Sequence, residues 1–307
     1  IITFMLPSLL RGSFVAIVTP FNDDGLLDEN SYRALLRWHI QSSTNGIVAC
    51  GTTGENATLT VEERERVIKI ALEECGGKIP VIGGIASNNT VEAVKQAVWI
   101  KGLGVDAALV LSPYYNKPPN EGLFQHFKAI AEVDIPIILY NVPGRTGSNV
   151  PAEVIIRLAR EVKGIAAVKE ASGNPGQIME ILRALSGDKT NWKSPNFTVL
   201  LGDDALTLPF IPLGATGCIS VVANETPQHF AEMIAAALSG DLQKAASLHF
   251  KLLPLMNINF VETNPLPVKT ALSLMGKIKP VFRLPLVPMQ TGNIEKLKKT
   301  LNELKLV

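Results

Sequence analysis

Lys169 ends a short apolar run, GIAAVKE over residues 164–170, where a charged side chain is not expected. Desolvating an ammonium group costs several kcal/mol unless the group is paired or gives up its proton. The neighbouring Glu170 points to the opposite face of an extended strand, so it is not the obvious partner. Burial disfavours the charged form of an amine, and a neutral amine can attack a carbonyl carbon to form a Schiff base.

Hydroxyl and guanidinium side chains follow several other apolar runs. They lie in the segments GTTGEN (51–56), SPYYNKP (112–118) and YNVPGRTG (140–147), and GDD follows at 202–204. Tyrosine and threonine hydroxyls can transfer protons to and from a carbinolamine and an enamine. A guanidinium can hold a carboxylate through two parallel hydrogen bonds. Grouped around one lysine, these residues indicate Schiff-base chemistry, which requires no metal or cofactor.

Each of these residues also has an ordinary structural interpretation. Gly51 and Gly54 are typical of a tight turn, and the threonines between them can cap local backbone. The pair Tyr114–Tyr115 is typical of packing, and Arg145 of a surface ion pair. Lys169 fits such an interpretation least, because the run before it is too apolar for a solvated edge.

The elements that must position these residues are eight nearly continuous apolar runs. Such runs are typical of strands buried on both faces of a parallel sheet. They cover residues 14–19, 46–51, 80–85, 107–112, 136–141, 165–170, 197–202 and 216–221. Amphipathic segments separate them; in one, Thr60 and Glu63 can form a capping box. This alternation predicts an α/β fold, a (β/α)8 TIM barrel. An open doubly wound sheet is the alternative, but TPFNDDG after the first run lacks its G-x-G-x-x-G motif.

The sequence predicts three parts along the chain. Residues 1–12 form an N-terminal extension, 13–240 the barrel, and 241–307 a small C-terminal helical domain, because this last stretch has no strand rhythm. The apolar N-terminus does not resemble a signal peptide, since its basic residue, Arg11, follows the apolar run.

Composition restricts the classes of partner. The 307 residues include 29 basic and 28 acidic side chains, so the net charge of +1 favours neither a nucleic acid nor a membrane surface as a partner. No run approaches the ~18 apolar residues of a spanning helix. Three widely spaced cysteines and four scattered histidines predict neither a disulfide framework nor a metal site, which suits a reducing cytoplasm.

The motifs GTTGE, SPYYNKP, YNVPGRTG, VKEASG and GDD, in this order and at these intervals, resemble the dihydrodipicolinate synthase family. That family belongs to the pyruvate-dependent class I aldolases, together with N-acetylneuraminate lyase. The resemblance runs from about Gly12 to the C-terminus and includes NPLPVK (264–269). It implies a condensation of pyruvate with L-aspartate 4-semialdehyde to 4-hydroxy-tetrahydrodipicolinate, the first committed step of lysine (diaminopimelate) biosynthesis, without a cofactor or metal.

The resemblance implies four catalytic residues. Lys169 forms the Schiff base with pyruvate, and Tyr140 acts beside it as acid and base. Tyr140 forms a proton relay with Thr52 and Tyr115. In the family the tyrosine at position 115 comes from a neighbouring subunit of a dimer of dimers, which implies a homotetramer. The other candidate lysine, Lys269 of NPLPVK, lies in a predicted C-terminal helix away from the barrel rim.

The resemblance also implies four substrate-binding residues. Thr53 binds the pyruvate carboxylate with help from backbone N–H groups of its turn, and Arg145 holds the carboxylate of the semialdehyde. Backbone atoms of Gly202 and Ile219 line the pocket. The arginine of YNVPGRTG separates the synthases from their lyase relatives.

An inhibitor site for L-lysine at the tight dimer interface is a further implication. Glu92 could pair with the α-ammonium of the inhibitor, and Tyr114 and Asn88 could bond its carboxylate. Sensitive relatives usually carry histidine or tryptophan where Val61 stands, and the charge of Arg64 opposes the ε-ammonium of lysine if its side chain points into the site. We therefore expect weak inhibition or none. The positions of this site read Asn56, Ala57, Val61, Arg64, Asn88, Glu92 and Tyr114.

Two alternatives to the synthase remain at the level of sequence. The first is a related pyruvate-forming or pyruvate-using aldolase or lyase that acts on a sugar acid or a hydroxy-keto acid. Arg145 speaks against it. The second is an inactive barrel that serves as a binding module, because a fold alone does not establish a function. The presence of Lys169, Tyr140 and Thr52 argues against this second alternative.

Overall fold

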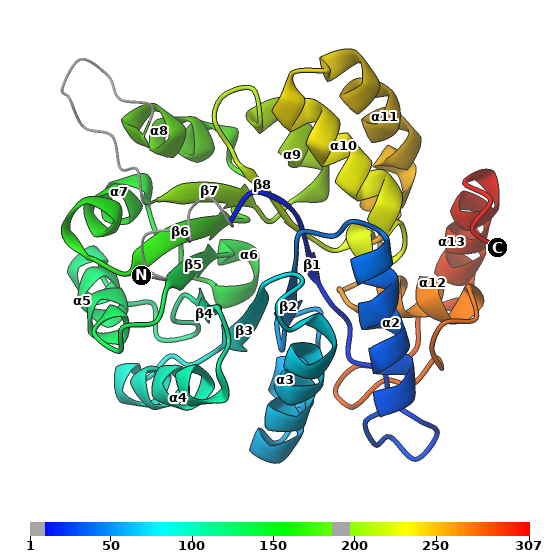
Figure 1. Ribbon diagram of the computed structural model, residues 1–307, viewed down its shortest axis with the longest axis horizontal. Coiled ribbons are helices and arrows are strands. Elements are labelled where there is room, and N and C mark those ends of the chain that lie inside the picture. Colours follow the sequence, from blue (N-terminus) through cyan, green and yellow to red (C-terminus); the bar gives the residue numbers. More distant parts are fainter. Residues whose placement is uncertain (1–9, 186–196) are drawn as a thin grey trace. The chain divides into compact units, whose positions relative to one another are not determined.

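A computed structural model describes residues 10–185 and 197–307 of the chain, and its strands form a closed barrel in sequence order (Figure 1). The (β/α)8 barrel predicted from the sequence is therefore confirmed. All strand residues but one are buried, as the nearly continuous apolar runs predict. The strands are β1 (Gly12–Ala16), β2 (Gly46–Ala49), β3 (Val81–Ile85), β4 (Ala107–Leu111), β5 (Ile137–Asn141), β6 (Ile165–Glu170), β7 (Thr198–Leu201) and β8 (Gly217–Ser220).

The chain forms two compact units. One is built around Ile82–Ile219, and the other combines Gly12–Val81 with Ser220–Val307. The boundary predicted at residue 240 lies inside the second unit and stays a prediction. Of the predicted N-terminal extension, residues 1–9 lie outside the described residues, whereas Leu10 is buried and β1 begins at Gly12.

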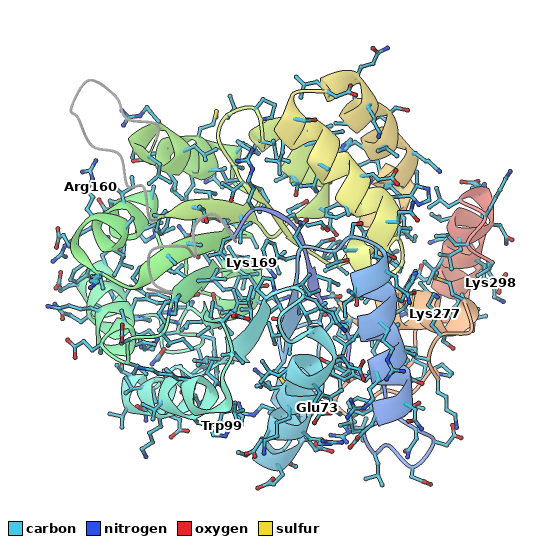
Figure 2. The ribbon with its side chains drawn as sticks, in the orientation of Figure 1. Glu73, Trp99, Arg160, Lys169, Lys277 and Lys298 are labelled. Carbon is cyan, nitrogen blue, oxygen red and sulfur yellow. The ribbon has the colours of Figure 1, made fainter. Side chains whose placement is uncertain are left out.

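In the unit around Ile82–Ile219, helices pack against one another outside the strands. Helix α4 packs on α5, α5 on α7, and α7 on α8. Lys169 lies among the strands of this unit, whereas Arg160 lies at its outer edge (Figure 2). The helices are α4 (Thr90–Leu103), α5 (Asn120–Ala131), α6 (Pro143–Thr146), α7 (Ala152–Glu161), α8 (Pro175–Leu185) and α9 (Asp204–Phe210).

The second unit contains β1, β2 and the C-terminal helices. Here α10 packs on β1 and α11, and α13 packs on α11 and α12. The predicted capping box is present, because the Glu63 amide donates to Thr60 Oγ1 at 3.2 Å and the Thr60 amide donates to Glu63 Oε2 at 3.0 Å. The helices are α2 (Glu29–Gln41), η2 (Asn56–Thr58), α3 (Val61–Cys75), η3 (Val222–Asn224), α10 (Pro227–Ser239), α11 (Leu242–Ile258), α12 (Leu266–Leu274) and α13 (Thr291–Glu303).

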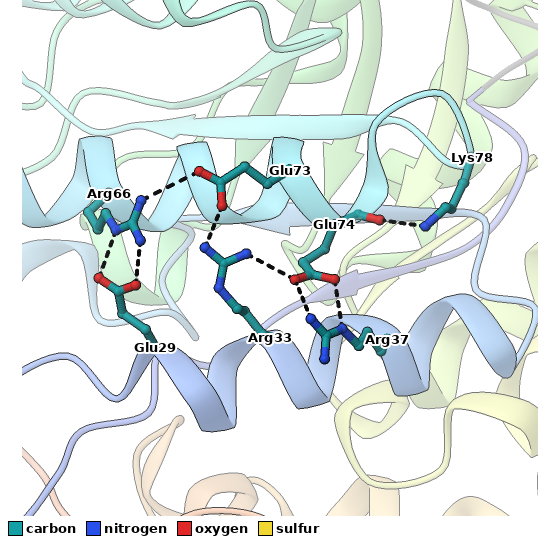
Figure 3. A network of polar contacts seen from close by, with 7 residues as sticks. All are labelled: Glu29, Arg33, Arg37, Arg66, Glu73, Glu74 and Lys78. Atoms are coloured by element: carbon teal, nitrogen blue, oxygen red, sulfur yellow. Dashed lines mark hydrogen bonds and ion pairs between the residues drawn. The ribbon is translucent and has the colours of Figure 1, made fainter.

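A network of ion pairs joins α2 to α3 (Figure 3). Arg37 Nε donates to Glu74 Oε2 at 2.8 Å, and Arg33 Nη1 donates to Glu74 Oε1 at 2.9 Å. These hydrogen bonds, the one from Arg37 foremost, hold the pKa of Glu74 at about 2. Arg66 binds Glu29 in the same network. Because α3 begins at Val61, shortly after the segment GTTGEN ends at Asn56, the network fixes the first helix that follows this candidate loop.

No helix in the described ranges is long and apolar enough to cross a membrane.

Candidate active site

The pairing of β5 with β6 places Tyr140 opposite Lys169. Lys169 is 5% exposed and Tyr140 is 7% exposed. The Lys169 Nζ lies 4.3 Å from the centroid of the Tyr140 ring. The lysine that the apolar run marks as unusual is thus buried, with a tyrosine beside its amine. This arrangement can place an acid or base next to a nucleophile.

Gly202 leaves the space that the Lys169 side chain occupies. A Cβ atom built on Gly202 would lie 2.9 Å from Lys169 Cε and 2.6 Å from Ala171 Cβ, closer than real Cβ contacts. The Gly202 amide donates to the Glu170 carbonyl at 2.8 Å, which holds the backbone after β7 against β6. Ile219 is fully buried on β8, the strand that pairs with β7. The structure therefore brings Gly202 directly to the candidate lysine.

Glu170 makes a buried polar network that the sequence analysis missed. Its carboxylate accepts from Asn141 Nδ2 at 3.0 Å, from Gln177 Nε2 at 3.1 Å and from the Ser172 amide at 2.7 Å. Asn141 Oδ1 in turn accepts from the Val150 amide at 3.0 Å. Strand alternation predicts the opposite face for Glu170, but it does not reveal these donors. The network ties β5, β6 and α8 together one residue beyond the Tyr140–Lys169 pair.

The segment with the two tyrosines is bonded to the turn that carries Arg145. The Tyr115 amide donates to the Thr146 carbonyl at 3.1 Å, and Arg145 is exposed beside it on α6. Tyr115 has a φ of +73°, which is uncommon for a residue other than glycine, and its side chain is 86% exposed. Asn88 Nδ2 donates to the Tyr114 carbonyl at 3.1 Å. The structure thus links two predicted site segments, 112–118 and 140–147.

The GTTGEN segment forms a compact turn in the other unit. The Gly54 amide donates to the Gly51 carbonyl at 3.1 Å, so the turn predicted for these glycines is present. A Cβ atom on Gly54 would lie 3.0 Å from the Ile17 carbonyl oxygen, which leaves little room for a side chain. Thr53 is 2% exposed, and its Oγ1 accepts from Asn264 Nδ2 at 2.9 Å. Thr52 and Thr53 belong to a different unit from Lys169 and Tyr140.

The predicted inhibitor positions are likewise divided between the units. Val61 is 50% exposed at the start of α3. Asn56 Nδ2 donates to the Cys50 carbonyl at 2.8 Å. In the other unit Glu92 lies 3.9 Å from Lys95 in an exposed pair. Of the other predicted inhibitor positions, Ala57 and Arg64 belong to the same unit as Val61, and Asn88 and Tyr114 to the same unit as Glu92.

Metal-ligating side chains and cysteine thiols are the other groups that could take part in catalysis. In the described residues, no group of histidine, cysteine, aspartate and glutamate side chains could hold a metal ion. The three cysteines are free and buried. Burial raises the pKa of the Cys50 and Cys75 thiols to about 12, so neither is an activated nucleophile.

Comparisons with known proteins agree over nearly the whole chain. A model of the dihydrodipicolinate synthetase family matches residues 9–304. The 4-hydroxy-tetrahydrodipicolinate synthase of Chlorobium phaeobacteroides is 49% identical over 299 residues, which are 97% of this chain and 98% of that protein.

Solved structures of the same family are similar in fold. The dihydrodipicolinate synthase of Acinetobacter baumannii complexed with pyruvate has a TM-score of 0.92 and 44% identity, covering 97% of this chain and all of that one. A monomeric dihydrodipicolinate synthase variant has a TM-score of 0.93 and 43% identity, covering 98% and 99%. The enzyme of Cyanidioschyzon merolae with lysine bound has a TM-score of 0.91 and 37% identity, covering 97% and 99%.

We predict that Glu170→Gln lowers the free energy of unfolding by about 1–3 kcal/mol. The amide that replaces the carboxylate has an N–H₂ group, which must face at least one of the donors from Asn141, Gln177 or Ser172. Urea unfolding followed by circular dichroism measures the change. Glu153→Gln is the matched control, because Glu153 also accepts from an asparagine, Asn120, but at the surface. Equal stability of the two variants would contradict the role assigned to the buried network.

Proposed function

The chain belongs to the dihydrodipicolinate synthetase family, and we propose that it condenses pyruvate with L-aspartate 4-semialdehyde, as a 4-hydroxy-tetrahydrodipicolinate synthase. The enzyme is then a lyase of lysine (diaminopimelate) biosynthesis. The observation that carries the proposal is the buried Lys169 at the end of β6, with the Tyr140 ring beside its amine. Three free, buried cysteines suit a reducing compartment, and we place the enzyme in the cytoplasm.

The reaction begins at the amine of Lys169. The amine adds to the keto carbon of pyruvate, and the resulting carbinolamine loses water to form an imine. Loss of a methyl proton gives an enamine, whose carbon forms the new C–C bond with the aldehyde of the second substrate. The amino group of that substrate then displaces Lys169 and closes the ring. We assign the proton transfers to Tyr140, with Thr52 and Tyr115 as the relay that the family pattern implies.

The carboxylates of the two substrates are assigned to different residues. Thr53 and backbone N–H groups of the GTTGEN turn bind pyruvate, while the exposed guanidinium of Arg145 binds the semialdehyde. Backbone atoms of Gly202 and Ile219 line the site. The assignment of Gly202 is supported by its closeness to the Lys169 side chain, where a Cβ atom would not fit.

We further propose that the enzyme is a homotetramer, a dimer of dimers. The support is Tyr115, whose backbone has a left-handed conformation. Its side chain is largely exposed and so is available to a neighbouring subunit. A related variant is monomeric, so assembly differs within the family.

We predict that sodium borohydride with pyruvate attaches a reduced adduct to Lys169. Borohydride reduces the imine to a stable secondary amine, and peptide mass mapping locates it. Lys169→Met should show no adduct, because it lacks the amine. Lys298→Met, on the exposed face of α13, is the matched control and should trap pyruvate normally. An adduct on Lys269, or none in the unaltered protein, would overturn the proposed mechanism.

We predict that Arg145→Ala lowers kcat/KM for the semialdehyde by roughly 30- to 1000-fold, the equivalent of about 2–4 kcal/mol of transition-state binding. Pyruvate trapping should change little, because the guanidinium is assigned to the second substrate. Steady-state kinetics and borohydride trapping separate the two effects. Arg160→Ala on α7 is the control. Equal loss of trapping would assign Arg145 to pyruvate or to the fold.

Steady-state kinetics with other substrates distinguishes the proposed synthase from the related aldolases and lyases. We expect turnover of the semialdehyde and none of a sialic acid or a 2-keto-3-deoxy acid. The opposite pattern would replace the proposed substrate.

We predict weak inhibition by L-lysine or none. Two like charges 4 Å apart repel by on the order of 4 kcal/mol at an effective dielectric of 20, before screening. Even about a quarter of this repulsion between Arg64 and the ε-ammonium weakens binding several-fold. Val61 adds neither a hydrogen bond nor an aromatic face. Titration of L-lysine against the initial rate measures the effect, and Val61→His should increase it. Half-inhibition below the millimolar range in the unaltered protein would refute this prediction.

A further inference from the structure

Lys269 is fully buried on α12, and its ammonium group forms an ion pair with Glu55 of the GTTGEN turn. The Glu55 side chain is fully buried as well. Lys269 Nζ also lies 4.3 Å from the centroid of the Phe21 ring. The sequence analysis set Lys269 aside as a lysine away from the barrel rim. The predicted C-terminal helix is present as α12, but the Lys269 side chain reaches the loop that follows β2 and so does not lie away from the barrel rim.

The same C-terminal segment holds the turn at a second point. Asn264, the first residue of NPLPVK, donates from Nδ2 to Thr53 Oγ1 at 2.9 Å. Lys269 is the last residue of this motif and binds Glu55, two residues after Thr53. One short segment thus fixes both a hydroxyl and a carboxylate of the turn.

A third contact holds the end of the same loop. Arg283 Nη1 donates to the Thr58 carbonyl at 3.1 Å, and its other nitrogen atoms bond the Gly25 carbonyl and the Glu63 carboxylate. The guanidinium also lies 4.2 Å from the centroid of the Phe21 ring. The C-terminal part of the chain therefore contacts the loop at Thr53, Glu55 and Thr58.

A buried ion pair is weak evidence for a role in stability alone. The desolvation of two charges offsets much of their attraction, and a buried pair can often be replaced by apolar side chains without loss of stability. Burial lowers the pKa of Lys269, although Glu55 opposes this effect. Glu55 has a φ of +55°, a left-handed conformation that is unfavourable for a residue with a Cβ atom. The pair therefore holds the turn in a backbone conformation that it would not readily adopt unaided.

We propose that Lys269, acting through Glu55, is a positioning residue for the carboxylate-binding turn. It fixes the backbone of GTTGEN, while Asn264 fixes the Thr53 hydroxyl. The inference rests on the proposed function, because it takes the ligand of this turn to be the pyruvate carboxylate. Misplacing a substrate-binding group by about 1 Å can cost on the order of 100-fold in rate.

The test uses the double variant Lys269→Met/Glu55→Gln in the full-length enzyme. Neither replacement leaves a buried charge, and both keep the approximate side-chain volume, so the fold should be retained. We expect KM for pyruvate to rise by about 10-fold or more, while KM for the semialdehyde changes less than about 3-fold. We expect kcat to fall as well, because the turn also carries Thr52 of the proposed proton relay. At saturating pyruvate, borohydride should still modify Lys169. Lys298→Met controls for loss of an exposed, paired lysine.

A second variant, Asn264→Ala, tests the other contact without altering any charge. It should raise KM for pyruvate by about 3- to 10-fold with little change in kcat. This variant decides the question if the double variant does not fold.

An unchanged KM for pyruvate in a folded variant would overturn the inference. Failure of the unaltered enzyme to trap pyruvate at all would overturn the proposed function instead. A uniform loss of kcat and of both substrate affinities, together with a lower melting temperature, would make Lys269 a structural residue only.

Discussion

The register between β5 and β6 is the constraint on which the candidate site depends. It places Tyr140 opposite Lys169 and, one residue further, Asn141 opposite Glu170. A slip of one residue would exchange the two faces of a strand. Lys169 would then lose its place beside Tyr140, and Glu170 would lose the donors that its buried carboxylate requires. The polar network around Glu170 on one face of β6 and Lys169 on the other face therefore both require the same register between β5 and β6.

Hydrophobic patterning predicts burial better than it predicts hydrogen bonding. The first apolar run, 14–19, corresponds to a strand at Gly12–Ala16. Ile17 and Val18 are still buried beyond the end of this strand, and the Ile17 amide still donates to the Val48 carbonyl at 3.2 Å. At this end Asn224 donates from Nδ2 to the Ala16 carbonyl and accepts from the Val18 amide, contacts that the local sequence does not reveal. The sequence therefore reveals the barrel but not the limits of each strand.

The same distinction applies to the site. Lys169 could be identified because a lone cation in an apolar run is a local anomaly, and alternation alone placed Glu170 on the opposite face. The partners of these residues could not be identified in this way. Gln177 reaches Glu170 from a helix, and Glu55 and Lys269 are separated by 214 positions in sequence. Such pairs depend on tertiary packing, and only the folded chain brings the two members together.

The contrast between the two buried lysines explains why burial alone does not make a nucleophile. The ammonium of Lys269 is held by a carboxylate, which favours its charged, unreactive form, and the whole side chain is shielded from solvent. The Lys169 amine instead lies beside the Tyr140 ring, the residue remains slightly exposed, and the missing side chain of Gly202 leaves the space that it occupies. This contrast supports Lys169, and not Lys269, as the amine proposed to attack pyruvate. The partner of each lysine, more than its burial, is the basis for assigning covalent chemistry to Lys169 and loop positioning to Lys269 in our proposals.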